Sequence, residues 1–325
     1  MKKLCSPNES DDWTIYGYAV WFTISKMRVP WSIVNIFARE SGLPAIPRPE
    51  ERSAFERVCN ENKEILLVED AEKRVVLLLR PSEDKARKII LEFSSKGDNS
   101  VRYEEYGEIR FENTLIIKRN EKSDLGGLGI EEVIEKIKAQ WIKEKECVTE
   151  EVIRKLLLKI LERVKSVKLK PSGSIYFVHR AKFKDIENFS NFLEKIKSMG
   201  HGSSSEFWYA PIGDAKLKKM ISIKVKEEFL NDFENVLLEI LQKIKSNRMK
   251  ANEILSTRKK VDELYNGALL YFDLLEEEIE ILRKMSKICI SLTQCKDFEK
   301  AVELLKKENE EALVRIFERV MEKVT

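Results

Sequence analysis

The chain has 325 residues, enough for two or three domains, and its 59 Lys and Arg against 56 Asp and Glu give a net charge of +3. This net charge is too small for the molecule as a whole to attract nucleic acid. Binding of nucleic acid would therefore need a local basic patch. Five scattered cysteines without a C-x-x-C pair argue against a disulfide framework and a structural zinc site.

The high proportion of charged residues, 35%, is typical of thermophile proteins. The first residues lack the apolar core of a signal peptide, and no apolar run approaches the roughly 20 residues that span a bilayer. We therefore expect a soluble, cytoplasmic protein without a membrane partner.

Residues 1–62 are predicted to be helical, after a polar leader. A helix over 13–27 is predicted from apolar residues at spacings of three and four, namely Trp13, Tyr16, Val20 and Ile24. A second helix is expected from Pro30 to Ser41 and a third from Pro49 to Asn60. With the strands that follow, these could form a winged helix-turn-helix; the alternative, favoured by the acidic residues of the third helix, is three helices that only pack.

Residues 63–122 change to a period of two, with short apolar runs between turn signals, which predicts an antiparallel meander. One face could carry a platform for single-stranded nucleic acid made of Lys88, Arg102, Arg110, Lys118 and Arg119 with Tyr103 and Tyr106. Glutamates interrupt these basic residues, so an ordinary solvated face is the favoured interpretation.

Residues 130–212 are predicted to form an α/β unit. Helices are expected over 130–145, 149–167 and 183–196, with strands over 174–178 and 205–210. The two strands could form a parallel pair through a right-handed crossover, and antiparallel pairing with other strands is equally allowed.

The 112 residues after Gly213 contain no proline and one glycine, Gly267, which predicts a long helical arm over 213–325. A coiled-coil seam with alternating spacings of four and three is predicted at Val261, Tyr265, Ala268, Phe272, Leu275, Ile279 and Leu282. Residues 214–260 hold 12 Lys and Arg against 7 acids, and residues 261–325 hold 10 against 15. The basic first part and the acidic second part of the arm would attract each other in a helical hairpin or in a homo-oligomer, or either part could pair with a helical protein partner.

Residues 138–188 carry 13 Lys and Arg against 7 acids, a local excess that phosphate contacts require. The residues expected to contact a nucleic-acid backbone are Lys165, Lys168, Lys170, Arg180, Lys182 and Lys184. An alternative is a metal-dependent, nuclease-like enzyme in which His179 and His201 bind the metal with Glu206 or Asp185. The first interpretation needs no cofactor, metal or catalytic residue.

Three stretches, VPWSIVNIFARESGLPAIPRPEERSAFERV (29–58), KPSGSIYFV (170–178) and SEFWYAPI (205–212), resemble an uncharacterised family of archaeal and phage proteins. The resemblance covers about 13–245, with Lys170 where the family is expected to have arginine, and it assigns no role to any residue. It implies an association with viruses or other mobile elements.

The sequence therefore predicts an α+β protein, with N-terminal helices, an antiparallel sheet, a central strand-helix-strand unit and a helical arm. The predicted function is non-enzymatic and nucleic-acid-associated, with oligomerisation through the arm. The alternatives are a protein-interaction scaffold that binds no nucleic acid and the histidine-centred metal enzyme.

Overall fold

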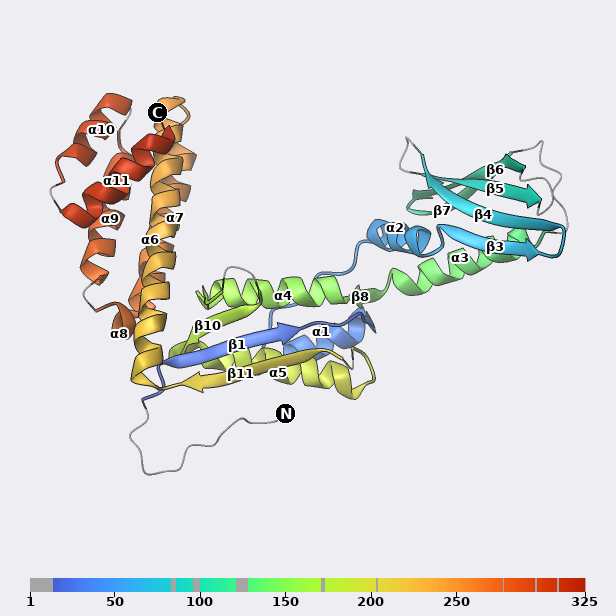
Figure 1. Ribbon diagram of the computed structural model, residues 1–325, viewed down its shortest axis with the longest axis horizontal. Coiled ribbons are helices and arrows are strands. Elements are labelled where there is room, and N and C mark those ends of the chain that lie inside the picture. Colours follow the sequence, from blue (N-terminus) through green and yellow to red (C-terminus); the bar gives the residue numbers. More distant parts are fainter. Residues whose placement is uncertain are drawn as a thin grey trace. The chain divides into compact units, whose positions relative to one another are not determined.

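The computed structural model describes residues 14–82, 86–95, 100–120, 128–170, 173–202, 204–276, 278–295, 297–308 and 310–324. The predicted leader lies outside these residues. The fold is mixed α+β with a helical C-terminal region, as predicted. Two compact units make up the chain: a first unit from 1–23, 155–193 and 204–325, and a second from 24–154 and 194–203 (Figure 1).

The first unit contains a four-stranded sheet in the order β11-β1-β10-β9, in which all neighbours are antiparallel. Its strands are β1 (Gly17–Thr23), β9 (Val167–Lys168), β10 (Ile175–His179) and β11 (Glu206–Ile212). Helix α4 (Glu150–Arg163) precedes β9, and the short 3-10 helix η1 (Arg180–Lys182) and α5 (Phe183–Ser198) separate β10 from β11. This order, β-α-β-β-α-β, is the ferredoxin-like split β-α-β arrangement. Most of the second unit is inserted between β1 and α4.

The prediction of a helix over 13–27 was wrong, because Gly17–Thr23 forms the central strand β1. Both edges of β1 are hydrogen-bonded, one to β10 and the other to β11. The strand has apolar side chains on both faces of the sheet, with Tyr18, Val20 and Phe22 on one face and Ala19 and Trp21 on the other. It therefore shows no clean alternation of apolar and polar residues, and its periodicity did not distinguish it from a helix. The loss of this helix also removes the three-helix arrangement that a helix-turn-helix domain requires. The strands β10 and β11 run parallel, but β1 lies between them.

Helices cover the two faces of this sheet to different extents. On one face, the ring of Phe183 in α5 stacks on Tyr18 of β1 at 4.0 Å, and Phe189 packs on Phe207 of β11 at 5.2 Å. Arg163 at the end of α4 forms an ion pair with Asp185 of α5, which holds these helices side by side. The other face receives the C-terminal helices.

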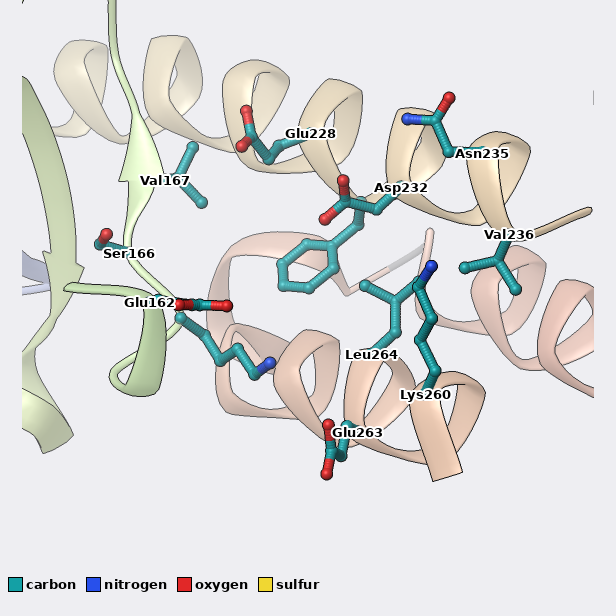
Figure 2. A pocket seen from close by; sticks show the side chains of 12 residues that line it. Glu162, Ser166, Val167, Glu228, Asp232, Asn235, Val236, Lys260, Glu263 and Leu264 are labelled. Atoms are coloured by element: carbon teal, nitrogen blue, oxygen red, sulfur yellow. The ribbon is translucent and has the colours of Figure 1, made fainter. Parts of the chain in front are cut away.

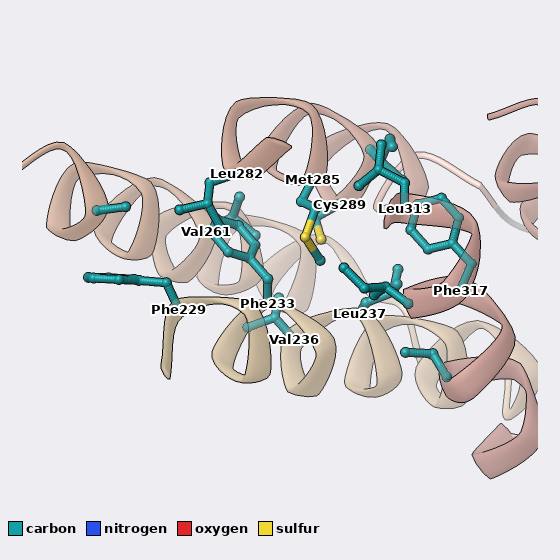
Figure 3. Close-up of a cluster of buried hydrophobic side chains, with 14 of the residues drawn as sticks. Phe229, Phe233, Val236, Leu237, Val261, Leu282, Met285, Cys289, Leu313 and Phe317 are labelled. Carbon is teal, nitrogen blue, oxygen red and sulfur yellow. The ribbon is translucent and has the colours of Figure 1, made fainter. Parts of the chain in front are cut away.

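The C-terminal part of the first unit is a helical bundle built around α6 (Ala215–Lys245). Five helices follow it: α7 (Ala251–Leu270), α8 (Phe272–Leu275), α9 (Ile279–Leu292), α10 (Phe298–Lys306) and α11 (Glu311–Val324). Side chains from α6, α7, α9 and α11 meet in one core, which includes Phe233, Leu282, Met285, Cys289 and Phe317 (Figure 3). The core continues to Phe177 and Ile212 of the sheet.

The predicted seam does not run along one continuous helix, and this part of the prediction was wrong. Its seven residues are distributed over α7, α8 and α9, with the chain turning after Leu270 and again after Leu275. Val261, Ala268, Leu275 and Leu282 are buried within the unit's own core, whereas Phe272 is 56% exposed. Successive short helices that pack on a common partner produce the same spacing as a coiled coil.

The second unit holds the predicted five-stranded antiparallel meander, which is confirmed. Its strands pair in chain order: β3 (Glu64–Glu69), β4 (Lys73–Pro81), β5 (Arg87–Ser95), β6 (Val101–Glu112) and β7 (Thr114–Arg119). The predicted helices α2 (Glu51–Glu61) and α3 (Ile130–Glu144) share one core with this sheet, which includes Phe55, Leu77, Ile134 and Trp141. The predicted second helix is α1 (Trp31–Glu40), and it lies beside a ribbon of β2 (Arg28–Pro30) and β8 (Cys147–Thr149).

Candidate nucleic-acid interface

The ferredoxin-like sheet carries a row of large apolar side chains at one end of its second face. Side chains of a strand alternate between faces, so Trp21 of β1 points to the opposite face from Tyr18 and Val20. In the strand register Trp21 lies between Ile175 of β10 and Trp208 of β11.

The two indoles lie side by side, with ring centroids 6.1 Å apart and planes inclined by 25°. Both are half-buried, and Ile175 is 38% exposed. We call these three residues the aromatic row.

The other half of the same face is closed by the helical bundle. Phe177 follows Ile175 by two residues on β10, so it lies on the same face, and it is fully buried. The centroid of its ring lies 6.1 Å from that of Tyr271, the residue between α7 and α8. Phe229 of α6 packs on the same tyrosine at 5.7 Å. The bundle therefore leaves the aromatic row outside the core while it covers the rest of the face.

The β9–β10 hairpin carries two basic residues at the edge of the sheet, near the end of β10 where Ile175 lies. The amide of Leu169 donates to the carbonyl oxygen of Ile175 at 3.0 Å, so the next residue, Lys170, lies at the end of the hairpin closest to that row. Lys170 is exposed. Lys168 lies opposite Tyr176 in the strand register, so its side chain is on the face of the sheet opposite to the aromatic row. These are two of the six predicted phosphate contacts.

The other predicted contacts lie elsewhere. Arg180 and Lys182 follow the opposite end of β10, where Arg180 forms an ion pair with Asp273 at 3.4 Å. Lys184 on α5 pairs with Glu187 at 2.9 Å. The structure therefore brings Lys168 and Lys170 together but does not gather the six residues into one patch.

Lys165 lies in a cleft of about 500 Å³ between the end of α4, α6 and α7 (Figure 2). Its backbone is left-handed, with a φ of 54°, and its carbonyl oxygen accepts a hydrogen bond from the Tyr271 hydroxyl. Lys260 also lines the cleft, together with four carboxylates: Glu162, Glu228, Asp232 and Glu263. Phosphates would be repelled by this surplus of negative charge, so the prediction of Lys165 as a phosphate contact finds no support here.

Two of these carboxylates resist ionisation. Burial among the cleft walls raises the pKa of Glu228, and the neighbouring charge of Asp232 adds to the effect. Burial likewise raises the pKa of Asp232, although the ammonium groups of Lys165 and Lys260 counteract it.

The histidines differ in their surroundings. His179 is buried, its Nε2 lies 3.1 Å from Oδ1 of Asp273, and its Nδ1 accepts a hydrogen bond from the amide of Ala181. The Nδ1 contact fixes η1 after β10, and the Nε2 contact joins the end of β10 to α8. His201 belongs to the other unit. Among the described residues no group of three or more His, Cys, Asp and Glu side chains is arranged to hold a metal ion.

Four of the five basic residues predicted for a platform on the five-stranded sheet are paired with glutamates, whereas Lys118 is exposed and Tyr103 is 60% exposed. Lys88 pairs with Glu105 at 3.0 Å, and Arg102, Arg110 and Arg119 also form ion pairs with glutamates. Tyr106 is buried and donates to a carboxylate of Glu131, so it is not available for stacking. These contacts agree with the interpretation of a solvated face.

Sequence reasoning missed Trp21 and Trp208, the residues that dominate the open part of the ferredoxin-like sheet. The only available signal was the aromatic content of two runs, TIYGYAVWF (14–22) and SEFWYAPI (205–212). Assigning the first run to a strand would have raised the question of which aromatic side chains share a face.

Comparison with models of known protein families identifies the family of the chain. Residues 15–309 match the model of a family of unknown function, DUF6744. The chain belongs to this family. The DUF6744 match continues through the helical region, beyond the limit near 245 that the sequence resemblance suggested. Neither a curated protein nor a solved structure matches the chain. In the part of the chain that the structure describes, every helix is too short or too polar to cross a membrane.

Proposed function

We propose that this DUF6744 protein is a non-enzymatic protein that binds single-stranded nucleic acid over the aromatic row. The observation that carries the proposal is the pair of neighbouring indoles, Trp21 and Trp208, on adjacent strands of a four-stranded sheet. Unpaired bases stack on aromatic side chains whatever their sequence, because every base has a π face.

The sheet geometry favours a single strand over a duplex. In one class of four-stranded sheet, that of RRM domains, aromatic side chains of the strands stack two or three splayed bases of RNA. The bases of a duplex are already stacked on one another and do not present their faces to such a surface. The exposed Lys170, at the end of the hairpin, is the residue to which we assign a phosphate next to the stacked bases.

The setting of this activity follows from the sequence resemblance. We propose that the protein acts in the cytoplasm, on nucleic acid of a virus or other mobile element, in an archaeal and thermophilic host. Its charged composition supports the thermophilic part of this proposal.

A second candidate function is a protein-interaction scaffold that assembles as an oligomer or on a helical partner. Three large apolar side chains on α7 and α8 support it: Leu255, Leu269 and Phe272 are 66%, 41% and 56% exposed. Monomeric proteins expose single apolar residues routinely, so this observation carries less weight than the indole pair.

Fluorescence anisotropy of labelled single- and double-stranded DNA and RNA tests the proposal. We expect the wild-type protein to bind single strands at low salt and to bind duplexes more weakly. The variant Trp21→Leu/Trp208→Leu keeps apolar side chains but removes both π faces, so its affinity should fall by at least about fivefold, since stacking contributes about 1–3 kcal/mol per base. Trp21→Phe/Trp208→Phe is the matched control that retains stacking. Equal affinity of the leucine and wild-type proteins would refute the role of the indoles.

A further inference from the structure

The first turns of α6 are strongly basic. Residues 214–226 contain five lysines against the single acid Asp214, whose carboxylate accepts hydrogen bonds from the first amides of the helix. A first turn favours acidic side chains, because they complement the positive end of the helix dipole. This helix has none there. The lysines are therefore not explained by the stability of α6 itself.

Two of the five lysines are occupied by neighbouring elements. Lys218 lies over the ring of Tyr16 at 5.0 Å and within 3.7 Å of a carboxylate oxygen of Glu276. Lys226 pairs with Glu278 at 2.9 Å. Both belong to the side of α6 that faces the start of β1 and the region after α8.

The other side of α6 is open. At about 100° per residue, Leu217, Met220 and Lys224 lie on the opposite side of the buried Ile221 from Lys218 and Lys226. Lys216 and Ile223 continue this side, which we call the open flank. Its three apolar side chains, Leu217, Met220 and Ile223, are 44%, 59% and 49% exposed, and Lys216 and Lys224 are also exposed.

The strand direction shows which part of the sheet the open flank faces. Ile221, Val225 and Phe229 of α6 belong to the same core as Phe177 and Ile212, which lie on the covered half of the sheet face. The occupied side of the helix points toward Tyr16, which precedes β1, so the open flank points along β1 toward Trp21. By this argument the open flank borders the half of the sheet face that carries the aromatic row.

We infer that the open flank of α6 binds the phosphate backbone of the single strand whose bases stack on the aromatic row. This inference rests on the proposed function and specifies it, because it assigns the phosphate contacts to Lys216 and Lys224 in place of Lys165 and Arg180. A polyanion complements the lysines, and the apolar stems of the flank cover the sugars. The pair of Lys224 with Glu227, at 2.6 Å and largely exposed, is weak enough to exchange for a phosphate.

The test is the salt dependence of binding of oligo(dT) and oligo(U), with the full chain. Each phosphate contact to a single strand contributes about 0.7 to the slope of log K against log salt. The variant Lys216→Gln/Lys224→Gln should lower the slope by about 1.4, so the factor by which affinity falls between about 50 and 200 mM salt should decrease about sevenfold. Lys259→Gln/Lys307→Gln removes two exposed lysines of the same unit and is the matched control.

Loss of fold does not confound this test. Lys216 lies in the first turn, where its replacement by glutamine removes an unfavourable interaction with the helix dipole, and the exposed pair of Lys224 with Glu227 adds little stability. Circular dichroism should therefore show an unchanged helix content. A slope that falls only in the α6 variant supports the inference. If the tryptophan variant loses binding while the α6 variant keeps the wild-type slope, the inference is refuted and the proposed function stands. If wild-type protein binds no single strand at low salt, the proposed function itself is refuted.

Discussion

Replacing Arg28 should destabilise the second unit more than the loss of an ordinary ion pair. Its guanidinium contacts carboxylates from three helices: Glu61 of α2 at 2.9 Å, Glu144 of α3 at 2.8 Å and Glu150 of α4 at 3.4 Å. It also donates to the carbonyl oxygen of Met27 at 3.1 Å. Burial alone would lower the pKa of Arg28, but these carboxylates, Glu144 above all, outweigh it and raise the pKa.

The expected loss in the free energy of unfolding follows from the Glu144 carboxylate that the variant Arg28→Met leaves with one cation fewer. The Glu144 side chain is 12% exposed and would keep only Arg57, whose Nε lies 3.5 Å from Oε2 of Glu144, as a cation. Breaking a buried ion pair by removing one partner costs about 3–5 kcal/mol. Because Arg28 is 24% exposed, we expect a smaller cost of about 2–3 kcal/mol. For a unit of this size that corresponds to a fall in melting temperature of roughly 8–12 °C.

Thermal melts followed by circular dichroism, with hydrogen exchange read by mass spectrometry, would measure this effect. Protection should fall in β2, β8 and α3 and stay unchanged in α6 and α9. The control Arg48→Met removes an exposed pair with Glu146 and should cost less than about 0.5 kcal/mol. The double variant Arg28→Met/Glu144→Leu should be more stable than Arg28→Met, since it leaves no unpaired carboxylate at that position. The reasoning is refuted if Arg28→Met costs no more than the control, or if the two changes of the double variant are additive.

Three further predictions concern single sites. Gly17→Ala should destabilise the first unit by about 1–3 kcal/mol in a urea titration, because the added methyl group would lie 2.4 Å from the opposed strand; a change below about 0.5 kcal/mol would contradict the packing of β1. The variant Glu228→Gln/Asp232→Asn should raise the melting temperature at pH 7. The raised pKa values mean that the folded state binds these protons more tightly than the unfolded chain, so ionisation opposes folding, and the gain should shrink as pH falls through the raised pKa values; a pH-independent gain would exclude this cause. Burial raises the pKa of Cys59 and of Cys289 to about 12, so neither thiol should react with iodoacetamide at pH 8 until the protein is unfolded, and rapid labelling of either in the native state would contradict its burial.

Local patterns in the sequence were sufficient for much of the fold. The meander of the second unit joins strands that are consecutive in the chain, so alternation and turn residues determine its order. The helices α2, α3, α5 and α6 each carry an apolar stripe that the structure buries. In these elements the local signal and the tertiary contacts agree.

The ferredoxin-like sheet could not be found in this way, because its central strand is far from its partners in the chain. Trp21 pairs with Ile175 and with Trp208, and an inserted unit separates these segments. No pattern within a short window reports such a pairing. The same separation hid the aromatic row, since a common face exists only once the register is known. The turns after Leu270 and Leu275 were missed for another reason, as the spacing of apolar residues continues across both.

Photocrosslinking tests the central claim most directly. A single-stranded oligonucleotide that carries 5-iodouracil would be bound to the full protein, irradiated and digested, and the modified peptides identified by mass spectrometry. Because iodouracil reacts with aromatic side chains against which it is stacked, we predict crosslinks at Trp21 and Trp208. Crosslinks confined to other parts of the chain, such as the five-stranded sheet or α9 to α11, would contradict the proposal that the aromatic row binds single-stranded nucleic acid.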